Sequence, residues 1–223
     1  METVRYSNVV FDLDGTLVDS YRALTTAVNA ARAAEGRGPI QVADVRAATG
    51  EGMELLLTRT WGGADYPQSY LERFEREYER VCVLETELLD DVLETIEELA
   101  RLGTRMGVCT NKPTAFSEQI LAQLEIGRHF SAVVGPDLAG VRKPDPAHVR
   151  FTMERIGGSP EETLFVGDMP IDVTAARGAG LDVAVIATGP SMKDALRASE
   201  PEYFLDQFSQ LVDVVMQGTV VAR

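Results

Sequence analysis

Residues 9–17 constrain this chain more than any other stretch. They read Val-Val-Phe-Asp-Leu-Asp-Gly-Thr-Leu, an apolar run followed by two carboxylates that are one residue apart. The run predicts a short buried strand, and on an extended backbone the side chains of Asp12 and Asp14 point to the same side. Two like charges held together are costly unless something positive lies between them. The stretch therefore predicts a site that holds a divalent cation, a proton or a lysine.

A hairpin turn is the ordinary alternative, because Asp-Gly is a common signal for one. A hairpin needs a second strand, but residues 20–34 carry apolar side chains at helical spacing. Gly15 instead permits a tight turn that brings the backbone close to a ligand. We therefore favour a ligand site over a hairpin.

The rest of the chain divides into a helical block and an alternating region. Residues 20–86 read as helices only, and from residue 90 onward helices alternate with four short apolar strands: 105–109, 131–135, 163–166 and 182–186. With 9–11, we expect five strands. Alternation of this kind indicates parallel strands with helices on both faces. We therefore predict an α/β fold, a doubly wound parallel-sheet (Rossmann-like) core of residues 1–17 and 88–223, with an inserted all-helical domain of residues 18–87.

Polar side chains follow three of the predicted strands directly. Parallel sheets of this type bind ligands at the carboxyl ends of their strands. The residues found there, together with a lysine in the sequence Arg-Lys-Pro-Asp-Pro, are Asp12, Asp14, Thr110, Asn111, Lys143, Asp168 and Asp172. Each has an ordinary explanation by itself, such as a helix cap, a solvated surface lysine or an acid in the first turn of a helix. Those separate explanations do not account for so many such residues falling at strand ends together. Their common position predicts that they line one pocket.

These motifs resemble the phosphatase branch of the haloacid dehalogenase superfamily. Residues 12–16 match its first motif, Thr110 its second, Lys143 in Lys-Pro-Asp-Pro its third, and residues 167–172 its fourth. The order of elements matches over nearly the whole chain. The helical insert resembles the helical cap of phosphoglycolate-phosphatase-like members.

The resemblance implies a role for each matched residue. Asp12 is expected to attack phosphorus and form an aspartyl-phosphate, which is covalent catalysis. Asp14 is expected to protonate the leaving alkoxide and later to deprotonate the attacking water, a task that favours a raised pKa. Thr110 would donate a hydrogen bond to a phosphoryl oxygen, and Lys143 would offset the negative charge.

The resemblance also implies Mg²⁺. It would be held by Asp12, Asp168 and the backbone carbonyl of Asp14, with Asp172 as a further ligand or as an anchor for the ligands. A site of carboxylates without His or Cys suits Mg²⁺. Each pair of unit negative charges near 4 Å costs roughly 4 kcal/mol at an effective dielectric constant of about 20. A divalent ion together with Lys143 can reverse that repulsion when a phosphate dianion binds.

The expected function is a Mg²⁺-dependent phosphatase that hydrolyses a small phosphomonoester. Residues 49–53 resemble the substrate-facing loop of the family, so Gly50 and Glu51 are expected to contact substrate together with Asn111, Thr110 and Lys143. Arg46 and Arg59 could serve an anionic leaving group, but ordinary surface charge explains them better. The ester stays open among phosphoglycolate, a sugar phosphate, a nucleotide and pyrophosphate.

Two alternatives stay open, a sugar-phosphate mutase of the same superfamily and a module that binds a phosphorylated ligand without turnover. Mutases usually carry Arg or Lys where Glu51 stands, and pure binding has no use for Asp14 as a proton donor. A dehalogenase does not need Asp14. Cys109 is not followed by the Arg of a cysteine phosphatase, and the chain has no Gly-x-Ser-x-Gly elbow and no Walker loop.

Charge and composition limit the partners. The formal net charge of −14 repels phosphate backbones and anionic membranes, so we expect a small phosphorylated metabolite as partner, and neither nucleic acid nor a membrane. No apolar run approaches the length of a bilayer span, and the first residues lack a signal core. Cys82 and Cys109 form no disulfide framework, which favours a cytoplasmic protein.

The oligomeric state is expected to be a monomer or a homodimer. The helix predicted over 67–83 places Tyr70, Phe74 and Tyr78 on one face. That face could pack within the helical insert or against another subunit, and we favour the insert.

Overall fold

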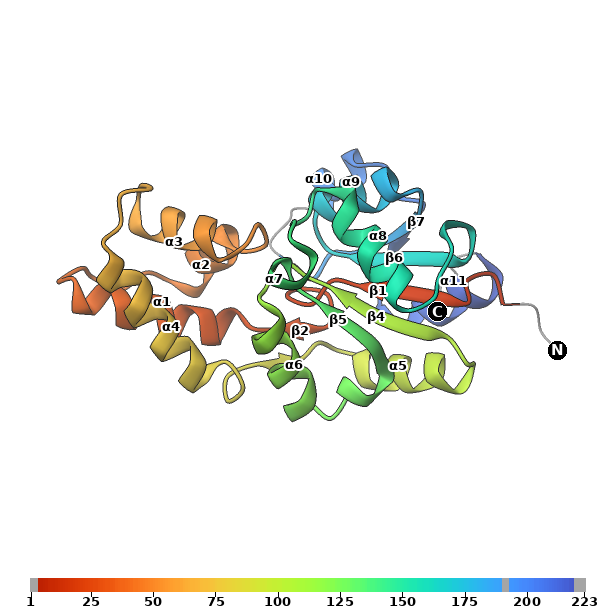
Figure 1. The fold of residues 1–223 in the computed structure, drawn as a ribbon, viewed down its shortest axis with the longest axis horizontal. Coiled ribbons are helices and arrows are strands. Elements are labelled where there is room, and N and C mark those ends of the chain that lie inside the picture. The colour runs from red at the N-terminus through yellow and green to blue at the C-terminus, as the bar shows by residue number, and fades with distance from the viewer. Residues whose placement is uncertain (1–3, 190–192, 219–223) are drawn as a thin grey trace.

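A six-stranded parallel sheet lies at the centre of the computed structural model, which describes residues 4–189 and 193–218 (Figure 1). The strands are β1 (Asn8–Phe11), β4 (Arg105–Cys109), β5 (Phe130–Val134), β6 (Thr163–Gly167), β7 (Asp182–Ile186) and β8 (Tyr203–Leu205). Their order is β5-β4-β1-β6-β7-β8, so β1 lies between β4 and β6. The order of the strands reverses at β1, and the crevice at such a reversal is where sheets of this type bind ligands.

Helices cover both faces of the sheet because the strands are apolar on both sides. Val9 and Phe11 of β1 belong to one core cluster and Val10 belongs to the other, as the two-residue period of a strand requires. The helices of the first face are α5 (Val92–Arg101), α6 (Thr114–Gln123) and α11 (Leu211–Gln217). Those of the second face are α8 (Pro146–Arg155), α9 (Pro170–Ala179) and α10 (Lys193–Ala198). Shorter elements complete the core: α7 (Pro136–Ala139), η1 (Gly127–His129), η2 (Pro160–Glu162) and η3 (Phe208–Gln210).

Four helices form a separate group beside the sheet (Figure 1). They are α1 (Tyr21–Ala34), α2 (Val42–Ala48), α3 (Met53–Trp61) and α4 (Gln68–Val81), and we call them the helical insert. The chain enters the insert through β2 (Val18–Asp19) and leaves it through β3 (Glu87–Leu88). These two strands pair antiparallel, so the two connections to the sheet lie side by side.

The predicted fold class, a doubly wound parallel sheet, is confirmed. The β2–β3 ribbon was not expected, because two-residue strands leave no periodic signal. The strand expected over 131–135 ends at Val134, because Gly135 turns the chain into α7, which begins at Pro136. The domain limits at 17/18 and 87/88 fall inside or next to the ribbon and stay a prediction, and the outer limits at 1 and 223 lie outside the described residues. Among the described residues, no helix has the length and apolar character that crossing a bilayer requires.

Candidate active site

Three neighbouring strands bring the predicted site residues to one edge of the sheet. Asp12 follows β1, Thr110 follows β4, and Asp168 follows β6. The backbone continues the sheet for one residue beyond two strands, since Asp12 N–H donates to Val166 O at 2.8 Å and Thr110 N–H donates to Val134 O at 3.0 Å. All three side chains are buried, with exposed fractions of 6% or less. Parallel pairing therefore fixes the positions of these three groups.

A buried lysine joins two of the acids. Lys143 Nζ lies 2.8 Å from Asp12 Oδ1 and 2.7 Å from Asp172 Oδ1, and its exposed fraction is 1%. Asn111 holds the backbone of Lys143, because its Oδ1 accepts from Lys143 N at 2.9 Å and its Nδ2 donates to Lys143 O at 3.0 Å. Lys143 is thus held at both ends, by Asn111 along its backbone and by two carboxylates at its ammonium.

The acids outnumber this cation, and their pKa values reflect that. Burial raises the pKa of Asp12 to about 6, although Lys143 lowers it, and Asp172 adds to the rise. Burial also raises the pKa of Asp168 well above its ordinary value, and the charges of Asp12 and Asp172 raise it further. Burial alone would lower the pKa of Lys143, but the two carboxylates outweigh burial and keep that pKa above its usual value. The cluster therefore favours the binding of additional positive charge.

Asp168 carries the feature that best fits a metal ion. Its Oδ1 accepts from Thr16 Oγ1 at 2.8 Å, but its Oδ2 is buried and has no hydrogen-bond partner among the described residues. Carboxylate oxygens of Asp12, Asp168 and Asp172 lie within 4.8 Å of one another. An oxygen-only donor set with an unpartnered carboxylate oxygen fits Mg²⁺, which binds through few protein carboxylates and keeps several waters.

Two glycines leave room at that oxygen. A Cβ on Gly189 would lie 1.5 Å from Asp168 Oδ2, and a Cβ on Gly15 would lie 2.6 Å from it. Gly15 also has a φ of +89°, which other residues rarely adopt. Two segments of backbone therefore approach this oxygen more closely than any side-chain-bearing residue could.

Both oxygens of Asp172 are engaged within the protein. Its Oδ1 accepts from Lys143 Nζ, and its Oδ2 accepts the backbone N–H groups of Asp168 at 3.2 Å and Met169 at 3.0 Å. The carboxylate thereby closes the first turn of α9 and orients Lys143. Of the two roles expected for Asp172, this geometry suits the anchor better than the direct ligand.

Asp14 faces away from Lys143 and toward a second lysine. Lys112 Nζ lies 2.5 Å from Asp14 Oδ1 and 2.7 Å from Asp14 Oδ2, and Ser20 Oγ also donates to Asp14 Oδ1. Lys112 is 8% exposed. Burial alone would lower the pKa of Lys112, but Asp14 outweighs burial and raises that pKa above its ordinary value, so the ammonium stays charged. The site thus contains two lysine–aspartate clusters, one at Asp12 and one at Asp14.

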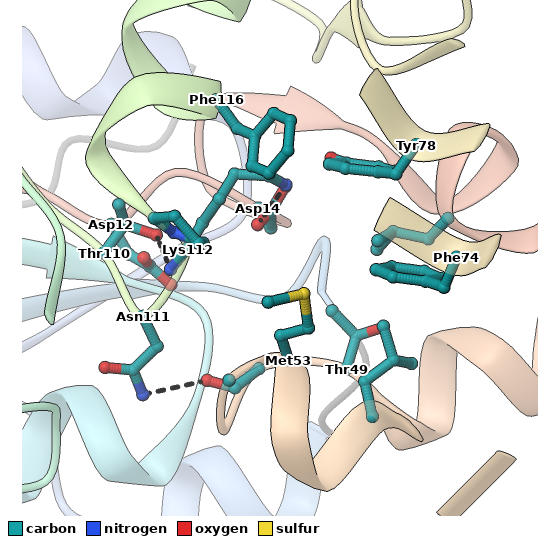
Figure 2. A pocket seen from close by; sticks show the side chains of 15 residues that line it. Asp12, Asp14, Thr49, Met53, Phe74, Tyr78, Thr110, Asn111, Lys112 and Phe116 are labelled. Atoms are coloured by element: carbon teal, nitrogen blue, oxygen red, sulfur yellow. Dashed lines mark hydrogen bonds and ion pairs between the residues drawn. The ribbon is translucent and has the colours of Figure 1, made fainter. Parts of the chain in front are cut away.

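A cavity of about 540 Å³, counting its open mouth, lies over Asp12 and Asp14 (Figure 2). The strand-end residues Thr110, Asn111 and Lys112 form one side. The opposite side comes mainly from the helical insert and α6, and its apolar and aromatic members are Leu24, Met53, Leu56, Phe74, Tyr78 and Phe116. Phe74 and Tyr78 stack with ring centroids 5.5 Å apart, and Phe116 meets Tyr78 edge-on at 5.1 Å. The cavity is charged at one end and apolar at the other.

The loop expected to face substrate, residues 49–53, lines this cavity with all of its residues except Glu51. Gly50 O accepts from Asn111 Nδ2 at 3.2 Å, so this loop contacts the sheet domain. A Cβ on Gly50 would lie 2.0 Å from Met169 Sδ, which shows how close the contact is. Glu51 does not line the cavity, because its carboxylate pairs with Arg59. The expectation that Glu51 contacts substrate therefore finds no support in its position, and we leave Glu51 out of the site.

Neither candidate arginine of the insert reaches the cavity. Arg59 is engaged by Glu51 and by Ala48 O, which agrees with ordinary surface charge. Arg46 instead reaches across to the sheet domain and donates to Thr188 O and to Gly189 O, the latter at 3.1 Å. Its role is therefore to join the insert to the loop after β7.

Three contributions to the site were missed from the sequence. Lys112 stands two residues after Thr110, and that spacing was the available signal. Thr16 belongs to the first motif but was given no role. Phe74 and Tyr78 were predicted to be buried within the insert; they are buried, and they also form a cavity wall. A pattern of apolar spacing gives the buried face of a helix but not what that face meets.

A family model described as haloacid dehalogenase-like hydrolase matches residues 6–180 of this chain. The matched range contains every residue of the site that lies at a strand end. It includes the complete helical insert as well.

Curated relatives and solved structures agree with that match. The phosphoglycolate phosphatase of Photorhabdus laumondii subsp. laumondii is 36% identical over 213 residues, which cover 93% of this chain and 91% of the relative. The phosphoglycolate phosphatase of Rhodospirillum rubrum is 36% identical over 215 residues, which cover 92% and 89%. The crystal structure of a predicted phosphoglycolate phosphatase from Haemophilus somnus has a TM-score of 0.84 at 28% identity and covers 94% of this chain and 98% of that one.

Proposed function

Because this chain belongs to the haloacid dehalogenase-like hydrolases and is a phosphoric monoester hydrolase, we propose that it is a Mg²⁺-dependent, phosphoglycolate-phosphatase-like enzyme that works through an aspartyl-phosphate. Its substrate is a small phosphorylated metabolite. One observation carries the proposal: Asp12, which has Lys143 at 2.8 Å and Thr110 on the neighbouring strand, opens into the same cavity as Asp14.

The nucleophile and the proton donor have separate environments. A carboxylate of Asp12 attacks phosphorus, the bond from phosphorus to the leaving oxygen breaks, and Asp14 gives that oxygen a proton. Water then attacks phosphorus, Asp14 takes the proton of the water, and the bond to Asp12 breaks to release inorganic phosphate. Thr110 donates to a phosphoryl oxygen in both halves, and the ammonium of Lys143 offsets the charge that accumulates beside Asp12.

The metal would be held by Asp12, Asp168 and the backbone carbonyl of Asp14. When bound, Mg²⁺ stabilises negative charge on the transferring phosphoryl group. Support comes from the unpartnered Oδ2 of Asp168 and from the space that Gly15 and Gly189 leave beside it. Asp172, whose oxygens are both engaged, positions Lys143 and the start of α9.

The test is phosphate release from p-nitrophenyl phosphate by the full chain with Mg²⁺ and with EDTA. We expect EDTA to abolish turnover. We expect Asp12→Asn to lower kcat by about 10⁴-fold or more, as loss of a nucleophile does in other hydrolases. The control is Asp65→Asn, an exposed acid of the insert that should leave kcat unchanged. Equal turnover by the Asp12→Asn variant would contradict the proposal.

The two alternatives make different predictions. A mutase would isomerise a sugar phosphate in the presence of a bisphosphate and release little phosphate. A binding module would bind phosphorylated ligands without turning any of them over. The cavity favours neither, because the insert contributes apolar walls instead of a cation for a second phosphate, and because Asp14 is present as a proton donor.

We also propose a cytoplasmic location. Cys82 and Cys109 are both free and buried, a state that needs no oxidising compartment.

A further inference from the structure

The hydroxyl of Tyr21 is a buried polar group that the proposed reaction does not use. Tyr21 is the first residue of α1, and its side chain is 2% exposed. Its hydroxyl is buried and has no hydrogen-bond partner among the described residues. Buried polar groups are almost always hydrogen-bonded, because an unpaired one costs free energy. The hydroxyl of Tyr21 therefore needs an explanation beyond the packing of its ring.

This hydroxyl lies beside Asp168 Oδ2, the unpartnered carboxylate oxygen of the site. A Cβ on Gly15 would lie 2.6 Å from the Tyr21 hydroxyl and 2.6 Å from Asp168 Oδ2, so both oxygens approach the same point. They do not form a hydrogen bond with each other, since neither has a partner among the described residues. The gap between them is thus too long for a direct hydrogen bond and short enough for one small bridging group.

The helical insert holds this arrangement together through Arg46. Its guanidinium lies over the Tyr21 ring, 4.9 Å from the ring centroid. The same guanidinium donates to the backbone oxygens of Thr188 and Gly189. The hydroxyl of Thr188 in turn donates to the backbone oxygen of Gly15. The phenol ring and the two glycine segments are therefore tied to one another by contacts of the insert.

Acidic side chains lie near the Tyr21 hydroxyl. Burial raises the pKa of this hydroxyl, and the charges of Asp168 and Asp14 raise it further, although Arg46 lowers it. The phenol therefore keeps its proton and adds no negative charge to the site. A leaving group does not reach it, because Tyr21 is not among the residues that line the cavity. These surroundings suit a contact with a hydrated cation instead of a contact with substrate.

We propose that Tyr21 is a positioning residue for the metal, and that its hydroxyl accepts a hydrogen bond from a water bound to Mg²⁺. The proposal rests on the metal site of the proposed function and adds to it a residue of the insert. Mg²⁺ keeps several waters and binds oxygens at about 2.1 Å in octahedral geometry, so neighbouring ligand oxygens are about 2.9 Å apart. A water next to Asp168 Oδ2 on the ion can then lie at about 2.8 Å from the Tyr21 hydroxyl. One hydrated ion thereby gives a partner to both oxygens.

The experiment measures the binding of Mg²⁺ alone to the full chain by isothermal titration calorimetry. We expect Tyr21→Phe to raise the Kd of Mg²⁺ by about 10-fold or more, as the loss of groups that orient a metal's ligands does. The matched control is Tyr66→Phe, which removes the hydroxyl of a half-buried insert tyrosine that packs on Tyr70. This control should leave the Kd unchanged.

A thermal melt separates the proposed role from a purely structural one. In EDTA, Tyr21→Phe should have the Tm of the unaltered protein or a higher one, because it removes a buried hydroxyl that has no protein partner among the described residues. With Mg²⁺ at about 10 times the Kd of the unaltered protein, the variant should show about a third or less of the Tm rise that the ion gives the unaltered protein. A hydroxyl that only supports the fold would lower both Tm values and leave the rise intact.

Three outcomes would overturn the inference while the proposed function stands. They are an equal Kd of Mg²⁺ in Tyr21→Phe and the unaltered protein, an equal rise of that Kd in Tyr66→Phe, and a Tm in EDTA that Tyr21→Phe lowers by more than about 3 °C. In each of these cases turnover of p-nitrophenyl phosphate that EDTA abolishes would uphold the proposed function. An unaltered protein that binds no Mg²⁺ would instead overturn the metal site of the proposed function, and with it the inference.

Discussion

The floor and the roof of the cavity differ in charge and in polarity. We define the floor as Asp12, which lines the cavity, together with Lys143, Asp168 and Asp172, which are buried and form one charged cluster with it but do not line the cavity. We define the roof as Met53, Leu56, Phe74 and Tyr78. The floor is formed at strand ends or anchored to them, and consists of charges that have fixed partners except at Asp168 Oδ2, which has none among the described residues. The roof comes from the helical insert and is apolar except for one phenol. Under the proposed function, the floor would supply the phosphoryl chemistry and the roof would decide which leaving group fits.

Lys112 lies where these two regions meet. It follows β4 in the sheet domain, but it packs against Tyr78 of the insert and pairs with Asp14. Floor substitutions should therefore change stability, metal binding and kcat. Roof substitutions should mainly change selectivity.

The largest expected effect is the loss of the buried floor lysine. Lys143→Met leaves Asp12 and Asp172 buried without their counter-ion, which should lower the free energy of unfolding by about 3–5 kcal/mol. Urea denaturation measures it. Lys193→Met, at an exposed lysine, should change that free energy by less than about 0.5 kcal/mol. Equal effects at the two lysines would mean that the floor charges contribute nothing to stability.

The next largest effect concerns the metal. Mg²⁺ at about 100 times its Kd should add about 2.7 kcal/mol to the free energy of unfolding, which for a chain of this length raises Tm by roughly 5–10 °C. A thermal melt with and without Mg²⁺ measures the shift. Asp168→Asn should remove most of the shift, because it replaces the unpartnered oxygen, and Asp65→Asn should retain it. A shift of the same size in all three proteins would place the ion elsewhere.

A smaller effect is expected at the roof. Met53→Ala removes side-chain volume from the wall that faces the leaving group. The preference for 1-naphthyl phosphate over ethyl phosphate should rise about 10-fold in kcat/KM. Val42→Ala, at an exposed position of α2, is the matched control. If Met53→Ala lowered kcat/KM equally for both esters and left their ratio unchanged, the proposal that the roof determines selectivity would be wrong.

The smallest effect concerns a neutral group that lies close to the charged floor. His148 is fully buried in α8, with Nε2 3.2 Å from Val134 O, and burial together with Lys143 lowers its pKa to about 4. The unfolded chain binds the proton near pH 6.5, so the stabilisation that comes from neutral His148 is complete above that pH and is lost as pH drops from 6.5 toward 4. From pH 7 to pH 5.5 this single contribution falls by about 1 kcal/mol. Asp12 and Asp168, whose pKa values are raised in the folded protein, act in the opposite direction.

Urea denaturation of the unaltered protein and of His148→Gln at both pH values isolates this contribution as the difference between their pH dependences. Val42→Ala changes no titratable group at an exposed position, so it should keep the pH dependence of the unaltered protein. The same pH dependence in His148→Gln and in the unaltered protein would contradict the assignment.

The floor could be predicted from the sequence because of how strands end. Asp12 and Asp168 each stand directly after an apolar run, and parallel pairing brings such positions together without any knowledge of the loops. Lys143 stands well beyond the end of β5, so its position relative to the strands did not assign it to the site. The assignment came from the Lys-Pro-Asp-Pro motif in which it lies.

The roof could not be predicted in the same way. The sequence gives Phe74 and Tyr78 as the buried face of a helix, but the way in which α4 meets the sheet domain depends on contacts far apart in the chain. One such contact is that between Gly50 and Asn111. Glu51 illustrates the same limit, because its loop was identified correctly while the direction of its side chain was decided by Arg59.

The β2–β3 ribbon makes the insert an exchangeable module. Val18 lies opposite Leu88 and Asp19 opposite Glu87, so the chain departs and returns through a single seam, where facing Cα atoms are about 5 Å apart. A two-residue turn spans such a gap. Joining the chain at the β2–β3 pair would thus allow the helical insert to be replaced by another insert, or to be removed, while the register of β1 stays unchanged.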